Sequence, residues 1–223
     1  MTPRRVLIAL SVIIVFTLSL HAAPPTATEL AQSLQKKYDG VRDFSADFTH
    51  TYRGGVLRKE LSEKGRVVIK KPGKMRWDYL SPEVKTFVSD GTKIYSYIPQ
   101  DKQVIVSTVP KEDTAATPAL FLAGKGNLLR DFTVTLGDVP AGQPDGTVAL
   151  MLTPKTPQPD YDWLLLLVDP SSFTLRGLVT ADTQGGTSSL TFTNLKENIG
   201  VPDSSFVFNI PRGVDVVTDA SGK

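Results

Sequence analysis

Few residues of this chain are equipped for covalent chemistry. The sequence has no cysteine and only two histidines, His21 and His50. Cysteine nucleophiles, thiolate metal sites and sites built from several histidines are therefore excluded. Any serine–histidine–aspartate triad would have to use His50. Because His50 lies at the end of a strand pattern, just before the Gly54-Gly55 turn, the better interpretation is an exposed histidine without a catalytic role.

Three further groups of residues permit a catalytic interpretation, and a plainer one outweighs it each time. Ser33-x-x-Lys36 and Ser89-Asp90-Gly91 match spacings found in serine β-lactamases. The first also fits an amphipathic helix and the second a hairpin turn, while the Lys-Thr-Gly strand of that enzyme class is missing. Asp160 and Asp162 could form the acid–base pair of a glycosidase, but loop aspartates beside proline are usually turn formers.

The most informative pattern is apolar, and the chemistry it offers is binding. Within residues 70–98, Met75, Trp77 and Tyr79 alternate with charged residues, so one face of this strand is large and apolar. A turn at residues 89–91 then leads into a second apolar run. Such a face can bind an oily ligand, but alternating aromatic residues also suit the closed interior of any barrel.

The first 23 residues are typical of an export signal. Arg4 and Arg5 precede an apolar run from Val6 to Leu20, which is too short for a membrane span of about 20 residues. We expect residues 1–23 to be cleaved and residues 24–223 to form one domain. Arg4 and Arg5 also account for the net charge of +2. The remaining chain is therefore balanced in charge, which does not favour nucleic-acid binding.

After the signal, the sequence predicts a helix followed by many strands. The capping-box spacing of Thr26 and Glu29, with Gly40 as a stop, predicts a helix over residues 26–39. Alternating apolar residues and turn residues predict strands over residues 43–49, 57–71, 74–79, 84–89, 93–98, 103–109, 132–136, 148–153, 163–168, 175–181 and 188–194.

Two segments complete this prediction. Pro118 and Gly124 delimit a short second helix, and residues 202–217 close the chain with Phe206, Phe208 and Ile210 alternating. The fold class is mainly β, an incomplete antiparallel β-barrel, or half-barrel, covered by short helices. Since residues 163–168 are apolar on both faces, this strand should be covered by the sheet interior on one side and by a helix on the other.

The order of several motifs resembles one protein family. The motifs follow the first helix as FSADFTH, KKPGKMRWDYLSP, FVSDGTKIYSY, TPALFLAG, LTPK and FVFNIPRGVDVV. In this order, and at these spacings, they resemble the periplasmic outer-membrane lipoprotein carrier family LolA over nearly all of the mature chain. The resemblance implies a half-open barrel with a helical lid, and an apolar cavity that receives the acyl chains of lipoproteins. It also implies no cofactor and no enzymatic reaction.

The resemblance further implies a route and its partners. A carrier of this family accepts cargo from an ABC-type lipoprotein-releasing complex in the inner membrane and delivers it to an outer-membrane lipoprotein receptor. We therefore expect this chain in the periplasm, with lipoproteins as cargo, no nucleic-acid partner and a monomeric state. The alternative is a lipid- or peptide-sensing regulatory domain on the same half-barrel.

The resemblance also assigns residues to the cavity and the lid. Met75 falls on a bulky apolar position near the cargo entrance, Trp77 falls on a family tryptophan, and Leu120 and Phe121 fall in the lid helix. Lys71 falls where the family usually has an arginine that hydrogen-bonds lid carbonyls. Because lysine has no planar fork, we expect weaker lid closure here. The candidate cavity residues are Phe44, Phe48, Val67, Ile69, Met75, Trp77, Phe87 and Tyr95.

Basic residues gather between Arg58 and Arg76. They could dock an acidic partner or a lipid surface. They could equally form a solvated strand face whose lysines discourage aggregation. The sequence does not favour either interpretation.

Overall fold

The fold is one large sheet that follows an N-terminal helix. The computed structural model describes residues 25–54, 60–109 and 118–218, so the expected signal peptide lies outside the described residues. The strands are β1 (Asp43–Arg53), β2 (Glu60–Lys70), β3 (Lys74–Ser81), β4 (Lys85–Asp90), β5 (Lys93–Ile98), β6 (Gln103–Thr108), β7 (Phe132–Gly137), β8 (Val148–Pro154), β9 (Trp163–Val168), β10 (Leu175–Ala181), β11 (Thr187–Glu197) and β12 (Asp215–Thr218). The helices are α1 (Ala27–Asp39), α2 (Pro118–Leu122), α3 (Leu128–Asp131) and the 3-10 helix η1 (Asp203–Phe206).

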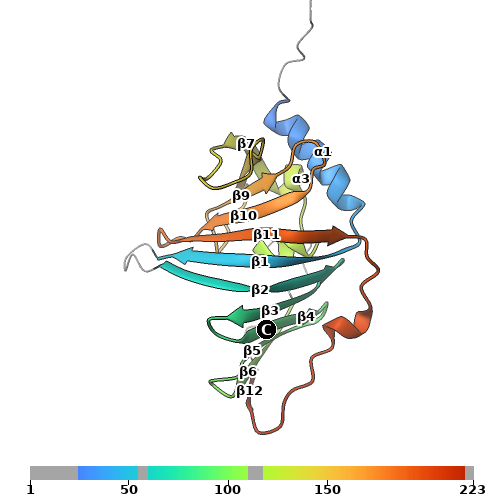
Figure 1. Cartoon of the computed structure of the whole chain (residues 1–223), viewed down its shortest axis with the longest axis vertical. Coiled ribbons are helices and arrows are strands. Elements are labelled where there is room, and N and C mark those ends of the chain that lie inside the picture. Colours follow the sequence, from blue (N-terminus) through green and yellow to red (C-terminus); the bar gives the residue numbers. More distant parts are fainter. Residues whose placement is uncertain (1–24, 55–59, 110–117, 219–223) are drawn as a thin grey trace, which may run out of the picture.

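The sheet is open. Its twelve strands lie in the order β12-β6-β5-β4-β3-β2-β1-β11-β10-β9-β8-β7, so the two end strands are not paired with each other. Figure 1 shows this order from β7 near the top to β12 at the bottom, with α1 at the upper right. All pairings are antiparallel except that of β12 with β6. This confirms the predicted half-barrel covered by short helices. Among the residues described, no helix is long and apolar enough to span a membrane.

The helix α1 begins and ends as its sequence predicts. The Thr26 hydroxyl accepts a hydrogen bond from the Glu29 backbone N–H, and the Glu29 carboxylate accepts one from the Thr26 backbone N–H. At the other end, the Gly40 N–H donates to the carbonyls of the last turn. The buried side of α1 carries Leu30, Ala31 and Leu34, which pack into the core. We call the sheet face that packs against α1 and α2 the inner face.

The inner face of the sheet carries the main core. In the register of β1, β2 and β3, Gly65 lies opposite both Phe48 and Tyr79. A Cβ atom at Gly65 would lie 2.6 Å from the Phe48 ring and 2.2 Å from the Asp78 carbonyl oxygen. Glycine at this position therefore lets the aromatic rings of neighbouring strands pack over the backbone.

Strand β9 is covered on both sides, as predicted, but not by a helix on its outer side. Its alternate residues Leu164, Leu166 and Val168 join the main core. Leu165 and Leu167 form a second cluster with Ala149, Met151, Trp163 and Val179. Loop residues 140–143, between β7 and β8, line a groove with Val179 on this side. The predicted helical cover is present on the inner side, where Leu166 lines a small cavity with Leu34 of α1 and Phe121 of α2. The outer side is buried in the second cluster instead of under a helix.

The chain after β11 covers the outer face of β3 to β5. In Figure 1 it passes the strand ends, goes through η1 and descends to β12. The alternating Phe206, Phe208 and Ile210 do not form a strand. Phe206 is buried at the end of η1, which packs against β3 and β4, and Phe208 stacks on Tyr95. The alternation thus reflects a segment that lies across the sheet rather than within it.

Candidate functional site

The inner face brings together most of the predicted cavity residues. The strand register sets Ile69 opposite Met75 and Val67 opposite Trp77, and Trp77 opposite Phe87. Phe44, Phe48, Val67, Ile69, Met75 and Trp77 are all buried in one apolar cluster, and Phe87 packs against it half-buried. The Phe48 ring meets the Trp77 ring edge-on, at a centroid separation of 5.2 Å. Sequence periodicity therefore identified one continuous apolar surface.

Tyr95 does not belong to this surface, and its predicted place among the cavity residues is wrong. Across the β4–β5 hairpin, Phe87 pairs with Ser96 and Val88 pairs with Tyr95. Tyr95 therefore shares the outer face with Val88, where its ring stacks on Phe208 at 5.4 Å. The neighbouring Ile94 packs against the inner core instead. The register across the turn, which alternation within each strand does not determine, decides which face each residue occupies.

The predicted second helix is confirmed as α2, and its C-terminal end is packed into the inner face. Phe121, Leu122 and Ala123 are buried in the main core. The Gly73 N–H, in the turn between β2 and β3, donates to the Ala123 carbonyl over 2.9 Å. Leu120 lies in α2, but its side chain is outside the described part of the structure. Phe121 therefore contributes one wall of the closed interior.

Lys71 contacts α1 rather than a carbonyl of α2. Its ammonium group donates to the Tyr38 carbonyl and lies 3.4 Å from the centroid of the Tyr38 ring. Its aliphatic part crosses Gly124, which has φ +84°, and a Cβ atom there would lie 2.5 Å from the Lys71 side chain. Burial lowers the pKa of Lys71 to about 8, although the nearby Asp39 and Glu197 oppose this shift.

Tyr38 provides the direct connection to α2 that sequence reasoning missed. Its hydroxyl donates to the Leu122 carbonyl, and its ring stacks on Phe121 at 6.3 Å. Burial raises the pKa of this hydroxyl, so it remains a donor at all physiological pH values. In the sequence Tyr38 is one of several apolar residues on the same side of the first helix, and that pattern does not distinguish it. Lys71, Tyr38 and Leu122 therefore form a chain of contacts, which we call the α1–α2 latch.

The space left beneath α2 is small. A cavity of about 20 Å³ lies between α1, α2 and the inner face of β1 and β9 to β11. Its lining residues include Leu34, Tyr38, Phe121, Leu166 and Leu195. Sites for small organic ligands typically have volumes of about 300–1,000 Å³. This cavity is therefore too small for such a ligand, and the neighbouring pocket beside Lys71, Gly124 and Leu128, at about 160 Å³, is also below that range.

A polar cluster lies at the other end of the inner face. The buried Glu63 carboxylate contacts Lys85 Nζ at 2.6 Å and His50 Nδ1 at 3.4 Å. His50 Nε2 lies 2.7 Å from Ser188 Oγ, and the Tyr79 hydroxyl lies 3.3 Å from His50 Nδ1. We call these five residues the polar cluster. The expectation of an exposed His50 is wrong, because cross-strand partners from β2, β3 and β11 enclose it. Burial is the main reason why the pKa of His50 is lowered.

The polar cluster contains the residue types of a serine–histidine–acid site but not its full geometry. The Glu63 carboxylate is beyond ordinary hydrogen-bond distance from His50 and is instead paired with Lys85. Ser188 lies within β11, which is paired on both sides by β1 and β10, so its backbone is committed to the sheet. An oxyanion hole needs free backbone N–H groups or equivalent donors beside the nucleophile. The cluster is therefore better suited to hydrogen bonding than to acyl transfer.

The other catalytic candidates are structural. Asp90 accepts hydrogen bonds from the Thr92 and Lys93 backbone N–H groups, which confirms the predicted hairpin turn. The Ser89 hydroxyl donates to the Gly73 carbonyl and links this hairpin to the turn between β2 and β3. Asp160 and Asp162 are exposed on either side of the buried Tyr161, in the segment before β9. Among the described residues, no cluster of acidic or histidine side chains could hold a metal ion.

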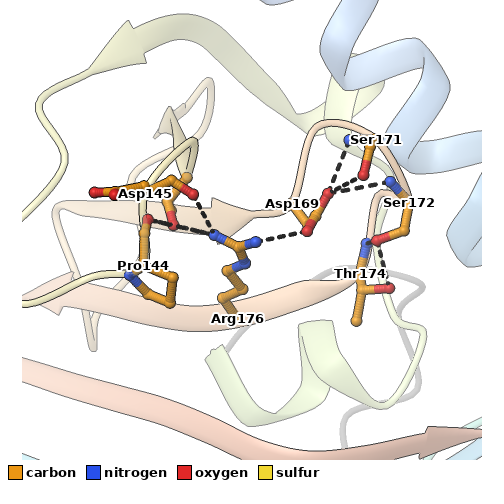
Figure 2. Close-up of polar contacts among 8 residues, drawn as sticks. Pro144, Asp145, Asp169, Ser171, Ser172, Thr174 and Arg176 are labelled. Carbon is orange, nitrogen blue, oxygen red and sulfur yellow. Dashed lines mark hydrogen bonds and ion pairs between the residues drawn. The ribbon is translucent and has the colours of Figure 1, made fainter.

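The turn after β9 begins at Asp169 and is fastened by Arg176. Figure 2 shows the Asp169 carboxylate accepting from Ser171 and Ser172 while its other oxygen pairs with Arg176. These hydrogen bonds hold the pKa of Asp169 well below its usual range. The same guanidinium donates to the Pro144 and Asp145 carbonyls over 3.4 Å. Arg176 therefore joins the loop between β7 and β8 to β10 and to the Asp169 turn.

Most of the described basic residues between positions 58 and 76 are paired with acids. Lys70 and Lys74 both contact the Asp203 carboxylate, at 2.7 and 3.2 Å. Arg76 lies 2.7 Å from Asp78. Arg58 lies outside the described residues. This pairing favours the interpretation as a solvated strand face that also holds the C-terminal segment, rather than a free docking surface.

Comparison with known proteins identifies relatives over the whole sheet. The family model for the outer membrane lipoprotein carrier protein LolA matches residues 39–209. The outer-membrane lipoprotein carrier protein of Chromohalobacter salexigens is 30% identical over 203 residues, covering 91% of this chain and 93% of that protein. The carrier protein of Pseudomonas fluorescens Pf-5 is 29% identical over 213 residues, covering 96% and 98% of the two chains.

Among solved structures, an uncharacterized conserved protein from Thermus thermophilus has a similar fold. Its TM-score is 0.52 at 14% identity, and the match covers 86% of this chain and 99% of that one. At this identity the similarity concerns the fold alone.

Proposed function

Since the chain belongs to the LolA family of outer-membrane lipoprotein carrier proteins, we propose that it carries lipoproteins by enclosing their acyl chains between the inner face and α2. The observation that carries this proposal is an apolar inner face closed by a five-residue helix rather than by the sheet itself. The candidate residues on this face are Phe44, Phe48, Val67, Ile69, Met75, Trp77 and Phe87. Phe121 and Leu120 belong to the closing helix.

The physical need for such an enclosure follows from the cargo. Exposing a methylene group to water costs about 0.8 kcal/mol, so a lipoprotein with two or three acyl chains cannot cross an aqueous compartment unprotected. Apolar burial is not directional and therefore accepts chains of different length and shape. Met75 suits this role because its unbranched side chain adapts to irregular contacts.

Opening the enclosure requires only local contacts to break. The described polar contacts of the α2 end are the Tyr38 hydroxyl to Leu122 and the Gly73 N–H to Ala123. The apolar contacts of Phe121 complete the closure. Acyl chains that displace α2 would replace these apolar contacts with their own. The inner face would then remain shielded from water in both the empty and the loaded state.

The family membership also supports a route for this chain. Its cargo would come from an ABC-type lipoprotein-releasing complex of the inner membrane and pass to a lipoprotein receptor of the outer membrane. The chain would act in the periplasm, as a monomer, after loss of residues 1–23. Its family consists of carriers rather than enzymes, so this role requires no cofactor and no catalytic residue.

A binding experiment with matched cargo tests this function. Purified residues 24–223 are mixed with a triacylated lipoprotein, or with the same protein carrying serine in place of its acylated cysteine. We expect a one-to-one complex in gel filtration with the acylated form alone. Equal binding of both forms, or binding of neither, would contradict the proposal.

A transfer experiment separates the carrier from the regulatory alternative. Inner-membrane vesicles that contain the releasing complex are incubated with the protein, and the soluble fraction is examined for lipoprotein. A carrier releases lipoprotein in amounts that scale with its own concentration. A sensing domain would bind lipid or peptide without increasing the amount released.

A further inference from the structure

Trp77 has a hydrogen-bond donor that the closed protein does not use. Its side chain is 5% exposed, and its indole Nε1 has no hydrogen-bond partner within the described part of the chain. Buried donors are almost always paired, because an unpaired donor forfeits its hydrogen bonds to water without replacement. A phenylalanine would fill an apolar site without this cost. The unpaired N–H therefore points to a partner that is absent from the closed state.

The position of Trp77 along the strands suggests what that partner is. Towards α2, the neighbouring positions on the inner face are Ile69 and Met75, which are wholly apolar. Towards the other end, Tyr79 leads directly to the polar cluster around Glu63. Phe48 bridges the two sides, since its ring contacts both Trp77 and Tyr79, the latter at 4.9 Å. Trp77 thus lies where the inner face changes from apolar to polar.

An acylated peptide also changes from apolar to polar along its length. Its hydrocarbon tails cannot accept a hydrogen bond, whereas the ester carbonyls that join them to glycerol can. The peptide beyond the ester linkage is rich in hydrogen-bonding groups. A ligand that matched the inner face would therefore place its tails beneath α2, its carbonyls at Trp77 and its peptide at the polar cluster.

We propose that the indole N–H of Trp77 donates a hydrogen bond to an ester carbonyl of the bound acyl chains and thereby fixes the orientation of the cargo. This inference rests on the proposed function. The tails lie towards Ile69, Met75 and Phe121. The polar part lies towards the cluster of His50, Glu63 and Lys85, whose paired charges disfavour hydrocarbon. Trp77 would then distinguish a glyceryl ester from a hydrocarbon chain of equal length.

The first test measures affinity for two matched ligands. The probes are a diacylglyceryl-cysteinyl peptide and its dialkyl ether counterpart, which keeps both chains and the peptide but lacks the two ester carbonyls. We expect the wild-type protein to bind the ester about fivefold more tightly. The Trp77→Phe variant keeps an aromatic ring beside Phe48 but loses the donor, so it should bind both probes equally.

The second tryptophan provides a matched control. Trp163 packs in the outer cluster with Ala149 and Leu165, on the opposite side of the sheet. The Trp163→Phe variant should therefore keep the ester preference of the wild type. Equal binding of both probes by the wild-type protein, or an ester preference that survives in Trp77→Phe, would overturn this inference. Failure of every protein to bind either probe would instead contradict the proposed function itself.

A fluorescence measurement tests the orientation. The chain has two tryptophans, so the Trp163→Phe variant emits from Trp77 alone. Diacylglyceryl-cysteinyl peptides brominated either next to the carbonyl or at the chain end serve as quenchers. We expect bromine next to the carbonyl to quench Trp77 more strongly. Stronger quenching from the chain ends would contradict the proposed orientation.

Discussion

At the scale of the single residue, Lys71 carries an ammonium group that is partly buried beside α1 and Gly124. Its contribution to the free energy of unfolding should therefore depend on pH. Burial lowers the pKa of Lys71 to about 8, from 10.5 in the unfolded chain. Between these two values the unfolded chain binds a proton that the folded protein has released. The free energy of unfolding must therefore rise with pH in this window, and it is independent of this group below about pH 8. The family arginine would remain charged throughout and would have no such dependence.

The Lys71→Met variant isolates this effect because methionine retains much of the aliphatic stem that crosses Gly124. We expect the wild type to gain on the order of 1–2 kcal/mol of stability relative to Lys71→Met as pH rises from 8 to 10.5, less than the full pKa shift would give, because water screens the partly exposed ammonium group. Chemical denaturation at several pH values measures this difference, and other titrating groups cancel in the comparison. A stability difference that stays constant, or that falls as pH rises, would show that burial does not lower the pKa of Lys71.

At the scale of elements, the sequence predicts where the strands begin and end better than it predicts which face of the sheet each side chain occupies. The β9 and β10 bounds agree with the predicted ranges 163–168 and 175–181, because period-two patterns and turn residues act locally. The facing of Tyr95 depends on the register across the β4–β5 turn, which no local pattern specifies. The four-residue helix α3 is too short for periodicity, although Asn127 caps it with its side chain.

The residues of the candidate site show the same difference between local patterns, which the sequence reveals, and contacts between distant segments, which it does not. Phe48, Val67 and Trp77 were predictable because alternation within a strand sets their common face. The α1–α2 latch and the polar cluster were not predictable, since each joins segments that lie far apart in the sequence. His50 illustrates this limit, because Ser188 is 138 positions away from it.

The latch between α1 and α2 makes a prediction at this scale. The Tyr38→Phe variant loses the hydroxyl that donates to Leu122 but keeps the ring that stacks on Phe121. We expect the free energy of unfolding to fall by about 1 kcal/mol. Because the closed state is then less favoured, the apparent affinity for a diacylglyceryl-cysteinyl peptide should rise by about fivefold. Denaturation and titration measure the two effects.

Tyr52→Phe is the matched control for this change. The Tyr52 hydroxyl lies 3.2 Å from Asp182, far from α2, and its side chain is exposed. Its removal should leave ligand affinity unchanged. If Tyr38→Phe lowers stability without raising affinity, the hydroxyl is structural and does not hold the lid closed.

At the scale of the whole molecule, an open sheet needs a cover on each face, and the two covers differ in strength. The outer face of β3 to β5 lies under residues 199–214, which are anchored by Phe206, by the Asp203 ion pairs and by the pairing of β12 with β6. The inner face is covered by α1 and by α2, and α2 is a five-residue helix whose end has few polar contacts among the described residues. The weaker cover is the one that acyl chains would have to displace.

Amide hydrogen exchange distinguishes these covers. On addition of a diacylglyceryl-cysteinyl peptide, we expect faster exchange at Ala123 and Gly124, whose N–H groups donate within the α2 turn, and at Gly73, which donates to Ala123. The amides of β12 and its partner β6 should keep their protection, because their pairing is not required to change. Faster exchange in β12 with unchanged exchange at Gly73 would mean that cargo enters from the outer face. The inner apolar surface would then be a permanent core, and α2 would be a structural helix rather than a lid.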